Sequence, residues 1–277
     1  MKMLLNSVAV AGALLGASAA GAGTLVTDWG YNVSTAWTAA TFSAGTGTTS
    51  QNASEIIWGG GGAYNNANLT PAAASSALVI SNTPAIGVVA TNTFPGPPPA
   101  YGLATVVTHY NNTLDGSRAF LSTATFQATL ALNPLNPAAP GFVLPSLGFT
   151  IKFKETPNIQ GGCLPGSVST CDDIFVLDAG ELTQGFDYDG FHYSVNIFDV
   201  NPTTLQPPGS FHTLTPQECA AAGAAAGCLG FTTQEKTFTP AQFAFFINAR
   251  ELPEPSSLAL LAVALVGLSA VARRRSV

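Results

Sequence analysis

Charged residues are scarce in this sequence, and they make up 9% of its 277 residues. Between residues 23 and 252, fourteen acidic residues outnumber five basic ones, which gives this segment a net charge of about −9. The five basic residues are scattered along the segment: Arg118, Lys152, Lys154, Lys236 and Arg250. Because binding to a nucleic-acid backbone requires clustered Lys and Arg, this composition excludes nucleic acid as a partner.

Residues that commonly perform catalysis are also few. The sequence has three histidines, His109, His192 and His212, and contains neither a His-Glu-x-x-His nor a Gly-x-Ser-x-Gly motif. A Ser-His-Asp set can be chosen from almost any sequence of this length, so the residue types alone carry no weight. We therefore expect no enzymatic activity. A hydrolase that depends on His109 remains as a less favoured hypothesis, after the two given at the end of this section.

A long uncharged run lies near the end of the sequence. Residues 256–272 include eight Leu and Val residues and no ionisable side chain, and Arg273, Arg274 and Arg275 follow directly. Seventeen helical residues span roughly 25 Å, which is at the short end of what a bilayer core requires. We predict a transmembrane helix here, with the three arginines on the cytoplasmic side.

Pro253, Glu254 and Pro255 stand immediately before this run. A Pro-Glu-Pro motif, an apolar helix and an arginine cluster in this order resemble the PEP-CTERM sorting signal of Gram-negative bacteria, here over residues 253–277. The resemblance implies that an exosortase, a membrane enzyme similar to transpeptidases, recognises the motif and removes the helix. The protein would then pass to the cell envelope or the exterior. The alternative is a plain membrane anchor, in which the two prolines merely break the chain before the helix.

The first residues have the features of a signal peptide. Lys2 precedes an apolar stretch from Met3 to Ala17, and Ala-x-Ala patterns follow at residues 17–19 and 20–22. We predict a signal peptide over residues 1–22, cleaved after Ala22. A retained membrane helix is less favoured because the apolar core is short and rich in Gly and Ala. Residues 23–252 then form the exported body, which is long enough for one large β domain or two small ones.

The four cysteines occur in two close pairs, and neither pair has the Cys-x-x-Cys spacing of a redox motif or a zinc site. In an exported protein such pairs indicate local disulfides. We predict the bonds Cys163–Cys171 and Cys219–Cys228.

Strand patterns dominate the exported body. Apolar and polar residues alternate in three segments, 120–132, 149–154 and 191–197, and Phe243, Phe245 and Ile247 indicate a last strand before Arg250. Shorter strands are expected near residues 31–42, 54–58, 77–80, 85–91 and 104–110. One short helix is expected after Thr215, where Thr-Pro-Gln-Glu resembles a capping box. Many short strands between Gly, Pro and Asn clusters predict an all-β fold, an antiparallel β-sandwich of jelly-roll type.

A polar strip, residues 108–112, ends one of these alternating runs. In the simplest interpretation, His109 hydrogen-bonds a loop, and Asn111 or Asn112 adopts a left-handed turn conformation. The pattern of Thr108, His109 and Asn111 also resembles the Thr-His-x-Asn signature of the THxN family of PEP-CTERM proteins, which is similar to choice-of-anchor K domains. The resemblance covers about residues 101–250. It implies a surface location and a domain without assigned activity, so it brings no catalytic residues.

Seven carboxylates lie within a stretch that has no Lys or Arg: Asp172, Asp173, Asp178, Glu181, Asp187, Asp189 and Asp199. Solvated loop charges are the favoured interpretation. Calcium is the alternative, because it accepts carboxylate oxygens in flexible geometry, and Asp187 and Asp189 stand beside a glycine turn. Five aromatic residues would either stack on sugars from an exposed sheet face or, as we favour, pack in the core. They are Trp29, Trp37, Trp58, Tyr64 and Tyr101.

These patterns together predict an exported, exosortase-sorted protein of the cell surface or extracellular matrix with a structural or adhesive role. Before processing, the C-terminal helix would hold it in the inner membrane. Exopolysaccharide is the expected partner in the matrix, and no cofactor is expected apart from the alternative of calcium. The second hypothesis is a calcium-dependent carbohydrate-binding module of the exopolysaccharide matrix.

Overall fold

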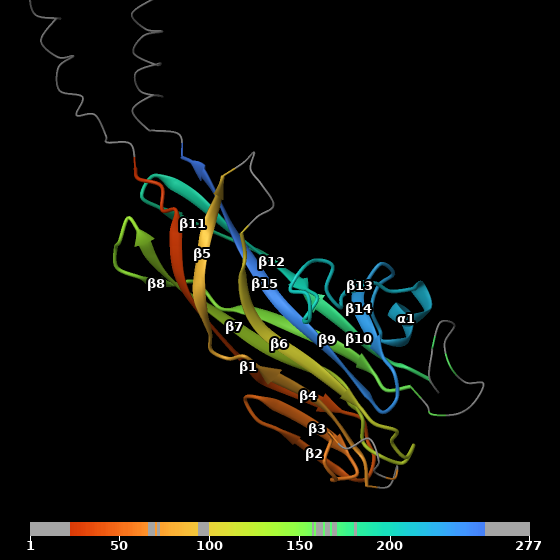
Figure 1. Ribbon diagram of the computed structural model, residues 1–277. Coiled ribbons are helices and arrows are strands. Elements are labelled where there is room, and N and C mark those ends of the chain that lie inside the picture. Colours follow the sequence, from red (N-terminus) through yellow and green to blue (C-terminus); the bar gives the residue numbers. More distant parts are fainter. Residues whose placement is uncertain are drawn as a thin grey trace, which may run out of the picture.

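The computed structural model describes residues 23–65, 70, 73–93, 100–156, 158, 163, 167, 171–179 and 182–252. The predicted signal peptide, the predicted transmembrane helix and the Pro-Glu-Pro motif lie outside these residues. The described part contains fifteen strands and one short helix (Figure 1). The first eight strands are β1 (Asp28–Phe42), β2 (Thr48–Gln51), β3 (Glu55–Gly59), β4 (Ser75–Ser81), β5 (Ala85–Thr93), β6 (Gly102–Asn111), β7 (Leu121–Asn136) and β8 (Phe142–Val143). The remaining elements are β9 (Leu147–Lys154), β10 (Asp173–Ala179), β11 (Thr183–Tyr188), β12 (Phe191–Val200), β13 (His212–Thr213), α1 (Pro216–Ala221), β14 (Leu229–Thr233) and β15 (Thr237–Glu251).

These fifteen strands belong to one mixed, mostly antiparallel sheet. Its main path runs β13-β14-β10-β9-β7-β1-β5-β15-β6-β4-β3-β2, while β8 pairs with β7, and β12 pairs with both β11 and β15. The pairing of β5 with β15 is parallel, whereas the other strand pairs in the described residues are antiparallel. The prediction of a β-rich, mostly antiparallel fold is therefore confirmed, with one parallel contact that the patterns did not indicate.

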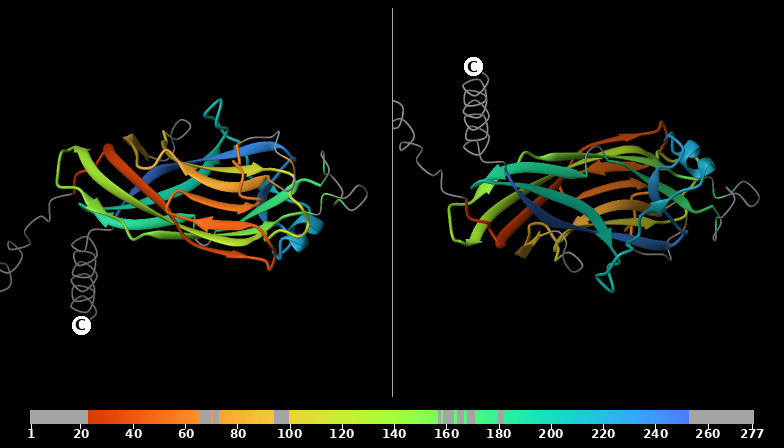
Figure 2. Two further views of the ribbon diagram at one scale, coloured as in Figure 1. Left: turned by 90° about the horizontal axis from the view of Figure 1, so that it is seen from below. Right: turned by 90° about the horizontal axis from the view of Figure 1, so that it is seen from above.

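The sheet curls so that its two halves face each other around a shared apolar core (Figure 2). Phe243 of β15 packs against Phe126 of β7, with ring centroids 6.0 Å apart. Towards the other end, Trp29 of β1 meets Tyr193 of β12 at 5.1 Å. Strands from both the first and the last third of the chain line the same core, because β1 and β5 lie between β7 and β15 in the sheet.

Period-two alternation predicted the buried faces of the long strands well. Phe149, Ile151 and Phe153 of β9 are buried, while Lys154 is exposed. Of the expected inward residues of the segment 120–132, Ala124, Phe126 and Leu132 are buried, while Ala128, Leu130 and Phe120 are half-buried, and Leu121 is more deeply buried than Phe120. A register shift between Thr41 and Phe42 of β1 accounts for this difference, because such a bulge moves the following side chains to the opposite face.

The short helix and both disulfides are confirmed. Helix α1 begins after Thr215, whose side chain accepts a hydrogen bond from the backbone of Glu218, and the Glu218 side chain accepts one from the backbone of Thr215. The bond Cys219–Cys228 links the buried face of this helix to the residue before β14, and Cys163 pairs with Cys171.

Both ends of the described body meet at a single turn between β11 and β12. The Asp189 carboxylate accepts a hydrogen bond from the backbone N–H of Thr24 at 3.0 Å. The carbonyl of the next residue, Gly190, accepts one from the backbone N–H of Leu252 at 2.9 Å. Residues 24 and 252 therefore lie at the same end of the elongated molecule, as Figure 1 shows from the start of β1 and the end of β15.

Candidate functional site: a buried carboxylate cluster

The Thr-His-x-Asn residues lie on β6 in the interior of the protein. His109 is fully buried, Asn111 is 1% exposed, and Thr108 is 8% exposed. The imidazole of His109 stacks on the indole of Trp58 at 6.0 Å and meets the edge of Phe153 at 4.9 Å. Neither ring nitrogen of His109 has a hydrogen-bond partner among the described residues, so the expectation that it bonds a loop is wrong. Alternation places position 109 on the inward face, where aromatic rings surround it.

The two asparagines bind backbone groups of neighbouring strands. The Asn111 amide donates to the carbonyl of Thr233 at 2.9 Å, and the Asn112 amide donates to the carbonyl of Ser75 at 2.7 Å. Among the described non-glycine residues, those with positive φ are Asn82, Cys171, Asp189, Leu205 and Lys236. The predicted left-handed turn at Asn111 or Asn112 is therefore wrong, because both side chains cross-link extended strands instead.

Three carboxyl groups converge next to Asn111. Glu155 directly follows β9, Asp173 begins β10, and Glu235 lies in the turn between β14 and β15. One oxygen from each lies within 4.8 Å of the others. Asp173 is fully buried and Glu155 is 7% exposed, whereas Glu235 is half-buried. The indole N–H of Trp58 donates to Glu155 at 3.1 Å, and the Asn111 amide approaches Glu235 at 3.4 Å.

Strand register explains how this carboxylate cluster forms. Asp173 pairs with Thr233 of β14, and Ile174 pairs with Lys154 of β9. Glu155 therefore stands beside Asp173 in the next position of the same ladder. Directly opposed residues of an antiparallel pair share one face, so Glu155, Asp173 and Thr233 form a row across three strand ends. Glu235 approaches this row from the β14–β15 turn.

Burial dominates the electrostatics of the carboxylate cluster. Loss of solvation raises the pKa of Glu155 to about 8, although the hydrogen bond from Trp58 opposes this rise. Burial and the neighbouring Glu155 and Glu235 raise the pKa of Asp173. Burial also raises the pKa of Glu235 to about 7, against hydrogen bonds from Thr113, Asn111 and Asn158. The Glu155 and Asp173 carboxyl groups are hydrogen-bonded to each other, which requires a proton on one of them. A group of three close carboxyls must therefore either share protons or surround a hard cation.

The predicted calcium pair lies elsewhere. Asp187, near the end of β11, is 2.6 Å from Nδ1 of His192, and Asp189 in the following turn accepts the Thr24 hydrogen bond described above. Asp172 and Asp173 are buried, so for these two residues the interpretation as solvated loop charges is wrong. Asp178 forms an ion pair with Lys152 at 3.0 Å. Glu181 lies outside the described residues.

The three tryptophans pack in the core, as favoured, and do not form an exposed stacking platform, whereas Tyr64 and Tyr101 do not belong to that core. Trp29 and Trp58 are fully buried and Trp37 is 4% exposed, while Tyr64 and Tyr101 are half-buried. Trp29 contacts one ring of β8 and three rings of β11 and β12: Phe142, Phe186, Tyr188 and Tyr193. These rings fill the space between the two halves of the sheet and leave none of the three indoles free for sugar.

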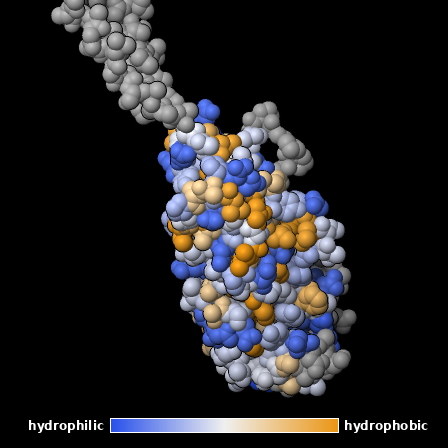
Figure 3. All heavy atoms as spheres, turned by 60° about the vertical axis from the view of Figure 1, so that its left-hand side comes forward, coloured by the Kyte–Doolittle hydropathy of each residue, from blue (hydrophilic) through white to orange (hydrophobic). Residues whose placement is uncertain are grey.

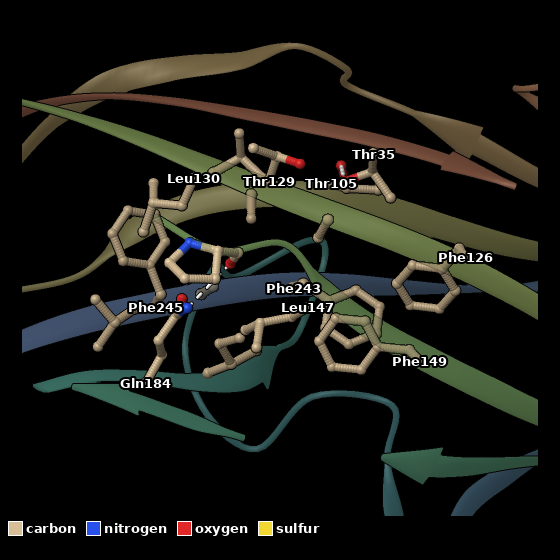
Figure 4. Close-up of a pocket in the computed structure, with 17 residues that line it drawn as sticks. Thr35, Thr105, Phe126, Thr129, Leu130, Leu147, Phe149, Gln184, Phe243 and Phe245 are labelled. Carbon is tan, nitrogen blue, oxygen red and sulfur yellow. Dashed lines mark hydrogen bonds between the residues drawn. The ribbon is translucent and has the colours of Figure 1, made fainter. Parts of the chain in front are cut away.

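A small, partly open apolar pocket of about 50 Å³ lies between the two halves of the sheet (Figure 4). Its lining includes Phe126, Phe149 and Phe243, and the Thr105 hydroxyl closes one side through a hydrogen bond to Thr35 at 2.8 Å. Ligand pockets of drug-sized molecules usually measure about 300–1,000 Å³, so this space is too small for a sugar or a cofactor.

A wider groove of about 400 Å³ lies on the outer surface between β1, β5, β7 and β8. The exposed apolar residues Ile86 and Val143 border it, at 71% and 64% exposure. Figure 3 shows hydrophobic residues interspersed with hydrophilic ones on the side of the molecule where these strands lie.

The PEP-CTERM protein-sorting motif matches residues 251–275, which begin at the last residue of β15. The motif implies an exported protein of the cell surface that is processed by an exosortase, and the two disulfides are consistent with a location outside the cytoplasm. A search of curated proteins finds no match to this chain. Among the described residues, no helix is long and apolar enough to cross a membrane.

Proposed function

We propose that this protein has a non-catalytic, structural or adhesive role in the cell envelope or exopolysaccharide matrix, to which an exosortase delivers it. The body would be a β-sandwich of jelly-roll type from the THxN group, with a cleaved signal peptide and a C-terminal membrane helix that is removed on sorting. The observation that carries this proposal is the sorting motif at residues 251–275, which starts where the last strand ends.

The position of the motif relative to the body supports this proposal. Glu251 still pairs with Phe191 in the sheet, and Leu252 is hydrogen-bonded to Gly190. The folded body therefore extends to within one or two residues of Pro253. An exosortase that processes the motif would therefore act close to the end of the folded body.

The interior supports a passive role. His109 is surrounded by aromatic rings, and Glu155 and Asp173 of the carboxylate cluster are buried. The pocket of about 50 Å³ is far below ligand size. A general acid or base must reach the proton it transfers, which the burial of His109, Glu155 and Asp173 disfavours.

Deletion and substitution of the tail test the sorting step. The full-length chain, a chain lacking Pro253–Val277, and a chain with Ala at Pro253, Glu254 and Pro255 would be expressed in a host that carries an exosortase. We expect the first to lose its tail and reach the envelope, the second to be released, and the third to remain unprocessed in the inner membrane. Cell fractionation with intact-mass analysis distinguishes these outcomes, and identical fractions and masses for all three would contradict the proposal.

The calcium-dependent carbohydrate-binding module has weaker support, because the three tryptophans are buried and Asp187 and Asp189 are already engaged by protein groups. Calorimetry with exopolysaccharide, in the presence and absence of calcium, separates the two functions. Binding that requires calcium would favour the module over the structural role.

A further inference from the structure

The buried carboxylate cluster and the adjacent Asn111 bring together side chains from four separate segments of the chain. Glu155 and Asp173 come from adjacent strand ends, and Glu235 comes from the turn that connects β14 to β15. Their nearest oxygens lie within 4.8 Å of one another. Asn111 reaches the same point from the end of β6, because its amide nitrogen lies 3.4 Å from Glu235. Close placement of three carboxylates in the interior is costly unless protons or a cation neutralise them.

Two neutral oxygens beside the carboxylates point to a ligand. Asn111 Oδ1 and Thr233 Oγ1 belong to residues that are each 1% exposed, and neither atom has a hydrogen-bond partner among the described residues. Buried polar atoms are nearly always satisfied, so each such exception requires an explanation. Thr233 is paired with Asp173 across the β10–β14 ladder, which places its hydroxyl on the same face as the carboxylate. A proton shared by two carboxyl groups leaves both neutral oxygens without a partner, whereas a hard metal ion takes such oxygens as ligands.

The donor set selects the type of ion. Carboxylates, an amide oxygen and a hydroxyl are hard ligands that suit Ca²⁺ or Mg²⁺ and do not suit thiophilic metals. Two oxygens bound to one Ca²⁺ stand at most about 5 Å apart, whereas around Mg²⁺ the limit is about 4.2 Å. Calcium therefore accommodates every separation up to 4.8 Å, and its irregular coordination tolerates ligands from four segments.

We propose that Glu155, Asp173 and Glu235 form a structural Ca²⁺ site, completed by the side-chain oxygens of Asn111 and Thr233. The ion would fasten the β14–β15 turn to the ends of β6, β9 and β10. The site is distinct from the exposed pair Asp187 and Asp189. It adds a stabilising ion to the proposed surface protein and does not depend on the sorting function.

The ion has a route to the site. Glu235 is half-buried and lies in a turn, while Glu155 and Asp173 lie deeper. Entry along the β14–β15 turn would therefore exchange the ion with solvent without opening the sheet. From the affinity range of extracellular calcium modules, we expect a dissociation constant on the order of 10⁻⁴ M.

Trp58 supplies a spectroscopic reporter, because its indole donates a hydrogen bond to Glu155. Terbium replaces calcium in oxygen-ligand sites and emits when a nearby tryptophan transfers its excitation. Full-length protein, purified in mild detergent and freed of metal with EDTA, is titrated with Tb³⁺ under tryptophan excitation. We expect emission that saturates at one ion per chain and that Ca²⁺ reverses. An absence of sensitised emission, or emission that Ca²⁺ does not reverse, overturns the proposal.

Isosteric amide variants separate this site from other carboxylates. Asp173→Asn and Glu235→Gln should each weaken Tb³⁺ binding at least tenfold. The matched control is a double variant, Asp187→Asn with Asp189→Asn, which should bind Tb³⁺ as tightly as the wild type does. Each amide also removes repulsion from the empty cluster, so these variants should fold at least as stably as the wild type in EDTA. Equal loss of binding in the control double variant would assign the ion to the exposed pair and refute the proposal.

Thermal unfolding provides an independent measurement. At about one hundred times the dissociation constant, Ca²⁺ should raise the unfolding temperature of the wild type by about 5–10 °C, and that of Glu235→Gln by much less. An unfolding temperature that stays unchanged up to about 10 mM Ca²⁺ would show that shared protons alone neutralise the carboxylate cluster.

Discussion

Acid should destabilise the folded protein through His109, and this effect can be isolated. His109 is fully buried between Trp58 and Phe153. Burial lowers the pKa of its imidazole from 6.5 to about 3. The nearest acidic residue along these contacts is Glu155, which is bonded to the indole of Trp58. The folded state therefore keeps His109 neutral at pH values where the unfolded chain has already bound a proton.

The sign and size of the effect follow from linkage. Because the unfolded state binds the proton more tightly, the free energy of unfolding falls as the pH drops below 6.5, and the loss ends near pH 3. The slope is at most about 1.4 kcal/mol per pH unit, so the loss reaches about 2 kcal/mol at about pH 5. The raised pKa values of Glu155, Asp173 and Glu235 act in the opposite direction, since protonation of these groups favours the folded state as the pH falls.

A difference curve between two proteins removes these opposing contributions. His109→Phe keeps a ring on Trp58, abolishes the titration and removes two buried nitrogens that lack partners. We expect it to equal or exceed the stability of the wild type at neutral pH, because an unsatisfied buried polar group costs about 1–3 kcal/mol. Its advantage should then grow by about 2 kcal/mol between about pH 7.5 and pH 5.

Urea unfolding followed by tryptophan fluorescence measures both proteins, in EDTA and with the disulfides intact. His109→Gln serves as the matched control: it cannot titrate but remains polar, so it should show the same growth with acid and no gain at neutral pH. If the curves of the wild type and His109→Phe run parallel across this pH range, His109 is solvated or protonated in the folded protein, and the reasoning fails.

Two further predictions concern packing. Gly230→Ala should destabilise the protein by about 3 kcal/mol or more, because the added Cβ would clash with the carbonyl oxygen of Phe175. Its control is Gly148→Ala, which should change stability by less than about 0.5 kcal/mol because no atom lies within 4 Å of the added carbon. Trp29→Ala should cost about 3–5 kcal/mol, because a fully buried indole is lost, whereas Phe238→Ala, at a residue 60% exposed, should cost little. Urea unfolding measures both pairs, and equal effects within either pair would contradict the packing described for it.

Alternation predicted strands and their buried faces because it depends on local geometry. The inward positions 149, 151 and 153 of β9 are an example. The order of the strands depends on long-range pairing, which periodicity does not report. No pattern in the sequence indicates that β1 lies between β5 and β7, or that β5 meets β15 in parallel. The bulge near Phe42 likewise arises from the pairing of two strands, and it moved the buried position from Phe120 to Leu121.

The buried carboxylate cluster could have been found in part from the same alternation. Glu155 continues the inward series of Phe149, Ile151 and Phe153, and Asp173 precedes Phe175 by two positions in the same way. An acidic residue in phase with an apolar face predicts a buried carboxylate. Their meeting with Glu235 could not be predicted, because it requires the register of β10 with both β9 and β14.

The course of β15 relates the two ends of the molecule to each other. Its last residue, Glu251, adjoins the turn that holds residues 24 and 252, and its first residue, Thr237, follows the β14–β15 turn that carries Glu235. Fifteen strand residues span roughly 45–50 Å, so the carboxylate cluster lies about this far from the end where the sorting motif begins. An ion in the proposed site would stabilise this far end of the sheet, where four chain segments meet.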